Sequence, residues 1–156
     1  MNRHIIVGND HGGYEAKLQL VRHMRARGLD VVDVGCDSTK IVRYPHYARK
    51  VAGAVARGEF PRGILLCSTG IGMCIAANKI KGVRASLCTD SYMARMTRQH
   101  NDSNVLCLGG KITGIAALID ILDAWLDARY IGGRHKISLG IIRRQEEAFG
   151  LTVPKD

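Results

Sequence analysis

The chain has 156 residues, 46% of them hydrophobic and 24% charged, which is typical of one globular domain with a buried core. No apolar run reaches the ~18 residues of a membrane helix, and the first residues lack a signal-peptide pattern, so we expect a cytoplasmic protein with no membrane partner. The net charge of +9 is spread along the chain, and aromatic residues make up only 5%, so we do not expect nucleic acid as a partner. A small anionic ligand, or simple solubility, explains the charge about as well.

Five cysteines occur, an odd number, and no two form a CxxC pair. They are Cys36, Cys67, Cys74, Cys88 and Cys107. This pattern favours reduced thiols in a cytosolic protein over a disulfide framework. Paired ligand spacing of the zinc-site kind is missing from the sequence, so we expect no bound metal.

Apolar runs alternate with amphipathic segments along the chain. In order, the pattern predicts a strand at 4–10, a helix at 14–28, a strand at 30–35, a helix at 45–57, a strand at 63–68, a helix at 72–80, a strand at 83–89, a helix at 90–100, a strand at 104–110, and helices at 113–130 and 135–150. Gly28 is the expected stop of the first helix, Pro45 lies at the first turn of the second, and Asp90 is a candidate N-cap.

The five short strands are apolar almost throughout and do not alternate with polar residues. Such strands form parallel sheets that are covered on both faces. We therefore expect a single three-layer α/β/α domain over 1–156 with a five-stranded parallel sheet. The final helix precedes no strand, so we expect it to pack on a partner subunit.

In open parallel sheets, ligands bind beyond the carboxyl ends of the strands. The first strand ends in 9–13, Asn-Asp-His-Gly-Gly, and the third ends in 67–72, Cys-Ser-Thr-Gly-Ile-Gly. The fourth ends near Thr89 and Asp90, and the fifth in 109–111, Gly-Gly-Lys. The 67–72 turn leads into a helix, where free backbone N–H groups form an anion cradle. It matches neither of the glycine-rich nucleotide motifs.

Cys67 borders this cradle, and two interpretations are open. A cysteine beside a helix N-terminus can form a reactive thiolate, whereas a strand cysteine is commonly a small buried hydrophobe. Cys74, Cys88 and Cys107 fit the second interpretation. His100 ends a helix at the amino edge of the sheet, away from the pocket of its own chain. If it is catalytic, it serves a neighbouring subunit together with Asn101.

Several motifs together resemble the type B ribose-5-phosphate isomerases, within the family that isomerises ribose, allose and galactose phosphates. They are NDHGG (9–13), YPHYA (44–48), CSTGIGMCIAANK (67–79), RQHNDSN (98–104) and GGRH (132–135). The resemblance covers residues 4 to about 145. It implies a cofactor-free aldose–ketose isomerase with a Rossmann-like fold, assembled as a homodimer with shared active sites and often as a tetramer.

The resemblance also implies residue roles. Cys67 is the base that moves a proton between C1 and C2, in the branch of the family that does not place a glutamate where this chain has Met73. His100 opens the sugar ring, and Thr69 moves protons between oxygens. The substrate-binding set is Asp10, His11, Tyr44, Ser68, Gly70, Ile71, Gly72, Asn101, Lys111, Arg134 and Ser138. Within it, the backbone of 68–72 stabilises the enediolate, and His11 and Arg134 bind phosphate.

Two positions depart from the family pattern at the phosphate end. Ser138 and Lys111 stand where the family often has arginines, so the bidentate contact of a guanidinium is lost at both. The reaction expected first is ribose 5-phosphate to ribulose 5-phosphate. The alternatives are isomerisation of another sugar phosphate, such as allose 6-phosphate or a tetrose phosphate, and a non-catalytic phosphosugar-binding module.

Overall fold

The computed structural model describes residues 4–155 and contains one parallel sheet of five strands. The strands are β1 (His4–Asn9), β2 (Asp30–Asp33), β3 (Gly63–Cys67), β4 (Ala85–Leu87) and β5 (Val105–Gly109). The helices are α1 (Tyr14–Ala26), α2 (Tyr44–Ala56), α3 (Ile71–Ala77), α4 (Ser91–Asn101), α5 (Ile115–Asp127) and α6 (His135–Ala148), with a short 3₁₀ helix at His11–Gly13. This confirms the predicted Rossmann-like α/β/α fold.

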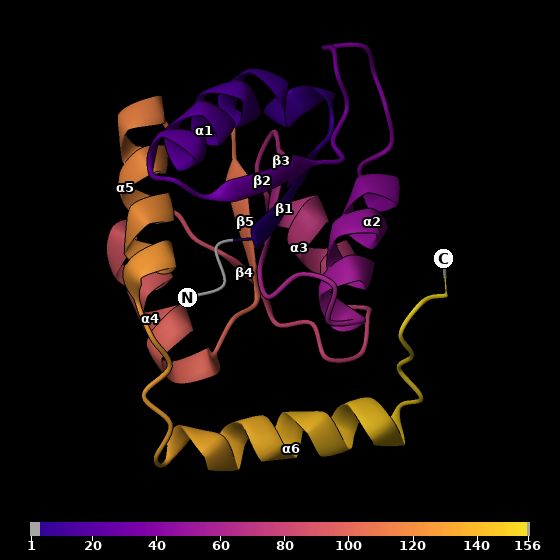
Figure 1. The fold of residues 1–156 in the computed structure, drawn as a ribbon. Helices are drawn as coiled ribbons and strands as arrows, with labels where there is room; N and C mark the ends of the chain where they lie inside the picture. Colours follow the sequence, from indigo (N-terminus) through magenta and orange to yellow (C-terminus); the bar gives the residue numbers. More distant parts are fainter. Residues whose placement is uncertain (1–3, 156) are drawn as a thin grey trace.

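The sheet has the strand order β2-β1-β3-β5-β4, with all neighbours parallel. Helices α1, α4 and α5 cover one face, and α2 and α3 cover the other (Figure 1). All five residues of β3 and of β5 are buried, which explains their unbroken apolar sequences. The chain reverses its winding direction between β1 and β3, and this crevice is where open α/β sheets bind ligands.

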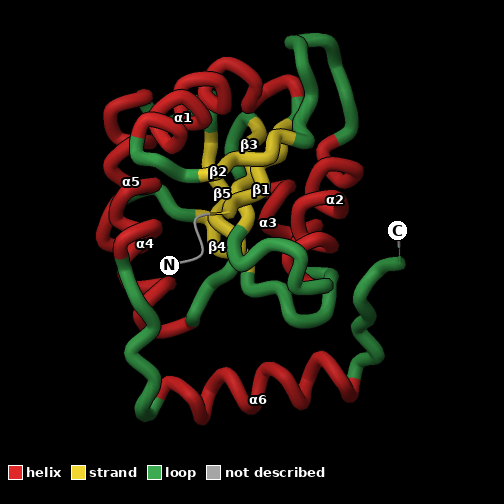
Figure 2. Tube along the Cα trace, viewed as in Figure 1, coloured by secondary structure: helices red, strands yellow, loops and turns green. Residues whose placement is uncertain are grey.

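Helix α6 differs from the others because none of its residues is buried. It runs beneath the amino edge of the sheet, apart from the layers that enclose the core (Figure 2). Its apolar side chains include Ile137, 69% exposed, and Ile141, 45% exposed. The expected covering by a partner subunit stays a prediction, and the unburied helix agrees with it.

The helix predicted at 113–130 ends earlier, at Asp127, because Ala128 adopts an extended conformation. The following segment lies along the end of α4, where the Ile131 N–H donates to the Gln99 carbonyl at 3.1 Å. The strand predicted at 83–89 is shorter, at Ala85–Leu87, because the Arg84 N–H donates to the Asn104 side chain instead of to a strand.

The helix signals at α1 and α4 are confirmed. Gly28 has φ +76° just beyond α1, a conformation that suits glycine. The Asp90 carboxylate caps α4 by accepting the Met93 N–H at 2.8 Å. Within residues 4–155, none of the helices has the length and apolar character required to cross a membrane.

Candidate functional site

The carboxyl ends of β1, β3 and β5 lie side by side and are joined by backbone hydrogen bonds. The Asp10 N–H donates to the Leu66 carbonyl at 3.1 Å, and the Gly110 N–H donates to the Cys67 carbonyl at 2.8 Å. Lys111 follows, with its N–H bonded to the Ser68 carbonyl at 3.0 Å. Three predicted site segments therefore meet at one edge of the sheet.

Cys67 ends β3 and is 6% exposed, with its sulfur facing the start of α3. The Gly70 N–H donates to this sulfur at 3.0 Å. Gly70 has φ +79°, and a Cβ there would lie 2.5 Å from the Leu87 side chain and 2.9 Å from the Leu108 backbone. Only glycine fits this position, and its conformation turns the backbone over the Cys67 thiol.

Two further glycines permit close contacts around the turn. A Cβ on Gly12 would lie 2.2 Å from the Ser68 hydroxyl, so the segment after β1 packs directly on the turn after β3. A Cβ on Gly72 would lie 2.9 Å from the ring of Tyr44, which extends from the start of α2. The aromatic ring therefore lies directly over the backbone of the turn.

Asp10 is 6% exposed and holds the short helix after β1 by accepting the Gly12 N–H at 2.9 Å. Its neighbour Asn9 is fully buried and donates to the Asp10 carbonyl at 2.8 Å and to the Cys36 sulfur at 3.1 Å. Sequence reasoning placed Asn9 only at the strand end. The hydrogen bonds of the Asn9 amide show that this residue also holds the backbone of Asp10 and the side chain of Cys36.

A cavity of about 210 Å³ lies beside this edge of the sheet. It is lined by His11, Gly12, Glu15, Ala16, Thr39, Gly110 and Lys111. The Nδ1 atom of His11 accepts the Val42 N–H at 3.3 Å, so a neutral ring carries its proton on Nε2. The His11 imidazole and the Lys111 ammonium are both groups that can bind an anion in this cavity. Sequence reasoning missed Thr39, which lies in a loop without a motif, and Glu15, in the first turn of α1.

The remaining predicted residues form a second cluster at the opposite, amino edge of the sheet. His100 and Asn101 end α4, Arg134 precedes α6, and Ser138 lies in its first turn. The ring of His100 stacks on that of His135, with centroids 4.3 Å apart and an interplanar angle of 8°.

The second cluster holds one permanent cation, Arg134, beside the stacked histidines. Desolvation, together with the charges of His100 and Arg134, lowers the pKa of His135 from its ordinary value of 6.5. The protonated, cationic form of the His135 ring is therefore disfavoured. An anion bound nearby would favour that form.

The two clusters cannot meet within one chain. Between them lies the length of β5, five residues or roughly 16 Å. The structure thus brings together Asp10, His11, Tyr44, 67–72 and Lys111, and it keeps His100, Asn101, Arg134 and Ser138 apart from them. The position of His100 agrees with the expectation from sequence.

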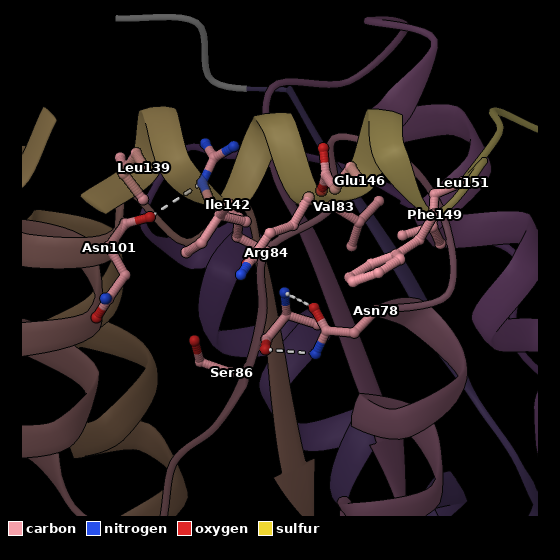
Figure 3. Close-up of a pocket in the computed structure, with 12 residues that line it drawn as sticks. Asn78, Val83, Arg84, Ser86, Asn101, Leu139, Ile142, Glu146, Phe149 and Leu151 are labelled. Atoms are coloured by element: carbon pink, nitrogen blue, oxygen red, sulfur yellow. Dashed lines mark hydrogen bonds between the residues drawn. The ribbon is translucent and has the colours of Figure 1, made fainter. Parts of the chain in front are cut away.

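A larger cavity, about 400 Å³, separates α6 from β4 (Figure 3). Cys67 does not line this cavity. Leu139, Ile142 and Phe149 line it on the α6 side, and Phe149 is 78% exposed. On the other side, the Asn78 amide bonds both the N–H and the carbonyl of Ala85, each at 2.9 Å (Figure 3).

Comparison with known proteins agrees with this arrangement. Residues 5–142 match the family model of ribose/galactose isomerases. Ribose-5-phosphate isomerase B of Escherichia coli strain K12 is 49% identical over 132 residues, covering 85% of this chain and 89% of that protein. The ribose-5-phosphate isomerase B structure from Clostridium thermocellum superposes with a TM-score of 0.92 at 46% identity, covering 94% of this chain and 99% of the other.

A further solved structure is that of ribose-5-phosphate isomerase B from Mycoplasma genitalium with bound ribulose 5-phosphate. It gives a TM-score of 0.89 at 37% identity and covers 92% of this chain and 96% of the other. Family model, sequence identity and fold agree over nearly the whole chain. The protein therefore belongs to the ribose/galactose isomerase family.

Proposed function

We propose that this protein is an aldose–ketose isomerase that interconverts ribose 5-phosphate and ribulose 5-phosphate. The observation that carries the proposal is the Cys67 sulfur, held at the exit of β3 with the Gly70 N–H 3.0 Å away. Isomerisation needs a base beside a carbonyl and donors for the oxyanion that develops. The thiol and the turn at 68–72 supply both at one place.

In the proposed reaction, His100 opens the furanose ring by moving a proton between its oxygens. The Cys67 thiolate then removes the proton from C2 of the aldehyde. The resulting enediolate is stabilised by backbone N–H groups of 68–72, and the Thr69 hydroxyl transfers a proton between the oxygens on C1 and C2. Cys67 returns its proton to C1, which leaves the carbonyl at C2. Asp10, Tyr44 and Asn101 hold sugar hydroxyls.

The phosphate would occupy the cavity that His11 and Lys111 line, with Arg134 reaching it from a second subunit. Ser138 supplies no charge at this end. The site thus has one cation fewer than the family pattern. This loss favours a second candidate function, the isomerisation of a sugar phosphate of different length or stereochemistry.

We also propose that the active unit is a homodimer, which can pair into a tetramer, and that each site takes Cys67 from one subunit and His100 from the other. The support is the length of sheet between the two clusters and the unburied apolar side chains of α6. A cytoplasmic location is proposed because all five cysteines, each within residues 4–155, are free thiols.

An isomerase assay over aldose and ketose phosphates of four to six carbons tests the proposal. We expect the fastest turnover with ribose 5-phosphate, and Cys67→Ala should lower it by on the order of 10²- to 10⁴-fold without unfolding the protein. Cys88→Ala is the matched control, because Cys88 is buried in the core on the opposite face of the sheet from Cys67. Unchanged activity of Cys67→Ala contradicts the assigned base, and no turnover of any substrate contradicts the isomerase.

A further inference from the structure

The loop at 34–43 joins β2 to α2 and makes two contacts at the cavity proposed for the substrate phosphate. It forms neither helix nor strand and stands out from the body of the molecule beside α2 (purple in Figure 1). Thr39 lines the cavity from this loop, and the Val42 N–H donates to Nδ1 of His11 at 3.3 Å. The shape of the cavity therefore depends on what holds the loop in place.

Lys17 holds the start of this loop from α1. Its side chain is buried, with 3% of the residue exposed. The ammonium donates to Oδ2 of Asp33 at 2.6 Å and to the carbonyl of Cys36 at 3.2 Å. Asp33 is the last residue of β2 and Cys36 is the third residue of the loop, so one buried cation joins the helix, the strand and the loop. Lysine is almost never buried to this extent unless its charge is paired.

Asn9 and Cys36 hold the same part of the loop to β1. The Cys36 N–H donates to the Asn9 carbonyl at 3.2 Å, and the Asn9 amide donates to the Cys36 sulfur at 3.1 Å. The Cys36 thiol in turn donates to the Ser38 carbonyl at 3.4 Å, one residue before Thr39. A Cβ on Gly35 would overlap Oδ1 of Asn9, so the loop backbone lies directly against the strand. A shift of Cys36 would therefore be passed to Thr39.

The isomerase reaction gives Lys17 no direct role. It does not line the cavity, and its ammonium already has two protein partners. Stability alone is a poor explanation of the ion pair with Asp33, because the cost of removing two charges from water offsets much of their attraction. The Asp33 carboxylate also accepts the Gly35 N–H at 3.0 Å, so the ion pair fixes the backbone that leaves β2.

We propose that Lys17 is a positioning residue for the substrate phosphate. By holding the start of the loop, it keeps Thr39 at the cavity and the Val42 N–H on Nδ1 of His11. With Nδ1 occupied as an acceptor, Nε2 is left to donate to a phosphate oxygen. The proposal rests on the proposed function, because the phosphate of a sugar is the expected ligand of the cavity.

The test replaces Lys17 with methionine, which is also unbranched and carries no charge. With Lys17→Met, we expect the KM for ribose 5-phosphate to rise on the order of tenfold and kcat to change less than about threefold. The loop loses its contact with α1, whereas Cys67 stays on β3 with its sulfur on the Gly70 N–H, so proton transfer at carbon continues. The Kd of inorganic phosphate, measured by an NMR titration of the His11 ring, should rise by about the same factor.

Lys50→Met is the matched control. The Lys50 ammonium lies 5.4 Å from the ring of Tyr47 in its own helix, as the Lys17 ammonium lies 5.3 Å from the ring of Tyr14. Lys50 is exposed, however, and it lines a different cavity beside α2. Both substitutions remove one positive charge, but Lys50→Met should leave KM and the phosphate Kd unchanged. Lys17→Arg, which keeps the cation, should restore part of the affinity.

Hydrogen exchange separates the loop from the rest of the fold. In Lys17→Met, the Val42 amide should exchange on the order of tenfold faster, because its bond to His11 opens more often. The Leu106 amide, in the buried strand β5, should change much less. A role in overall stability alone would speed the exchange of both amides by the same factor, since global unfolding exposes them together.

Equal rises in KM for Lys17→Met and Lys50→Met overturn the proposal, because the loss of net charge would then explain both. A fall in kcat at unchanged KM, or an unchanged exchange rate of Val42, overturns it as well. The same holds if phosphate does not shift the His11 signals of the unmodified protein, since the cavity would then lack its ligand.

Two outcomes are kept apart by this design. If the unmodified protein isomerises no sugar phosphate, the proposed function fails, while the phosphate titration and the exchange rates still decide the role of Lys17. If Lys17→Met does not fold, Asp33→Asn tests the same contact, because it removes the partner charge at a side chain that is 26% exposed. Asp33→Asn should raise the phosphate Kd, and an unchanged Kd in this variant overturns the proposal.

Discussion

His100 and Cys67 lie at opposite edges of the sheet, so a shared site predicts that two inactive chains can restore each other's activity. The perturbation is the mixing of Cys67→Ala chains with His100→Ala chains. In a hybrid dimer, one site combines both substitutions and is inactive. The other site combines the intact Cys67 of one chain with the intact His100 of its partner.

The size of the recovery follows from this geometry. If equal amounts of the two chains reassort at random, about half of the dimers are hybrids, and each hybrid has one intact site of two. We therefore expect about one quarter of the activity of the unmodified protein. If Cys67 and His100 of the same chain formed the site, every hybrid site would lack one of the two groups and recovery would be about zero.

The assay mixes the purified variants, allows subunits to exchange, and measures turnover of ribose 5-phosphate over time. Each variant alone supplies the background rate. Native mass spectrometry of chains with different tags measures the hybrid fraction, so that the activity can be divided by it. Activity at the background level, with about half of the dimers hybrid, would refute the shared site.

Two further predictions concern the edges of the sheet. Gly12→Ala should destabilise the protein by about 1–3 kcal/mol in urea denaturation, because its Cβ would lie 2.2 Å from the Ser68 hydroxyl. The control is Gly140→Ala in α6, which should leave the stability unchanged because its Cβ would meet only the end of Arg144 at 3.8 Å. Equal stabilities of the two variants would contradict the contact at Gly12. By NMR, His135 should titrate with a midpoint below 6.5. As the pH falls, this histidine is then protonated in the unfolded chain before it is protonated in the folded one. Its titration therefore lowers the stability of the folded protein as the pH falls through 6.5. His100→Asn should raise that midpoint and His23→Asn should not, while a His135 midpoint at or above 6.5 would contradict the stacked pair.

The fold was predictable from sequence because its strands are buried on both faces. The apolar runs that became β3 and β5 contain no polar position inside the sheet, so pattern alone identified them. Helix ends were less predictable. Residues 128–130 have helical composition, yet the backbone after Ala128 bonds to the end of α4, a contact that depends on tertiary structure.

The candidate site was predictable where it follows strand ends and less so elsewhere. The rule for parallel sheets placed Asp10, Cys67 and Lys111 at one edge, as the structure does. It could not reveal Thr39, which reaches the cavity from a loop, or the stacking of His135 on His100. Nor could it reveal the lowered pKa of the Cys74 thiol, because the largest cause is Cys107, which lies 33 positions later on β5.

The Asn78 amide that bonds both backbone groups of Ala85 has a consequence for the sheet as a whole. Strand β4 is the last in the order, and an edge strand exposes unpaired N–H and carbonyl groups that can recruit another chain. Asn78 satisfies both groups of one residue, as a sixth strand would, but it cannot be extended by further pairing. If the proposed dimer separates, each subunit would therefore still have this residue of its edge strand blocked, which opposes pairing with a strand of another chain.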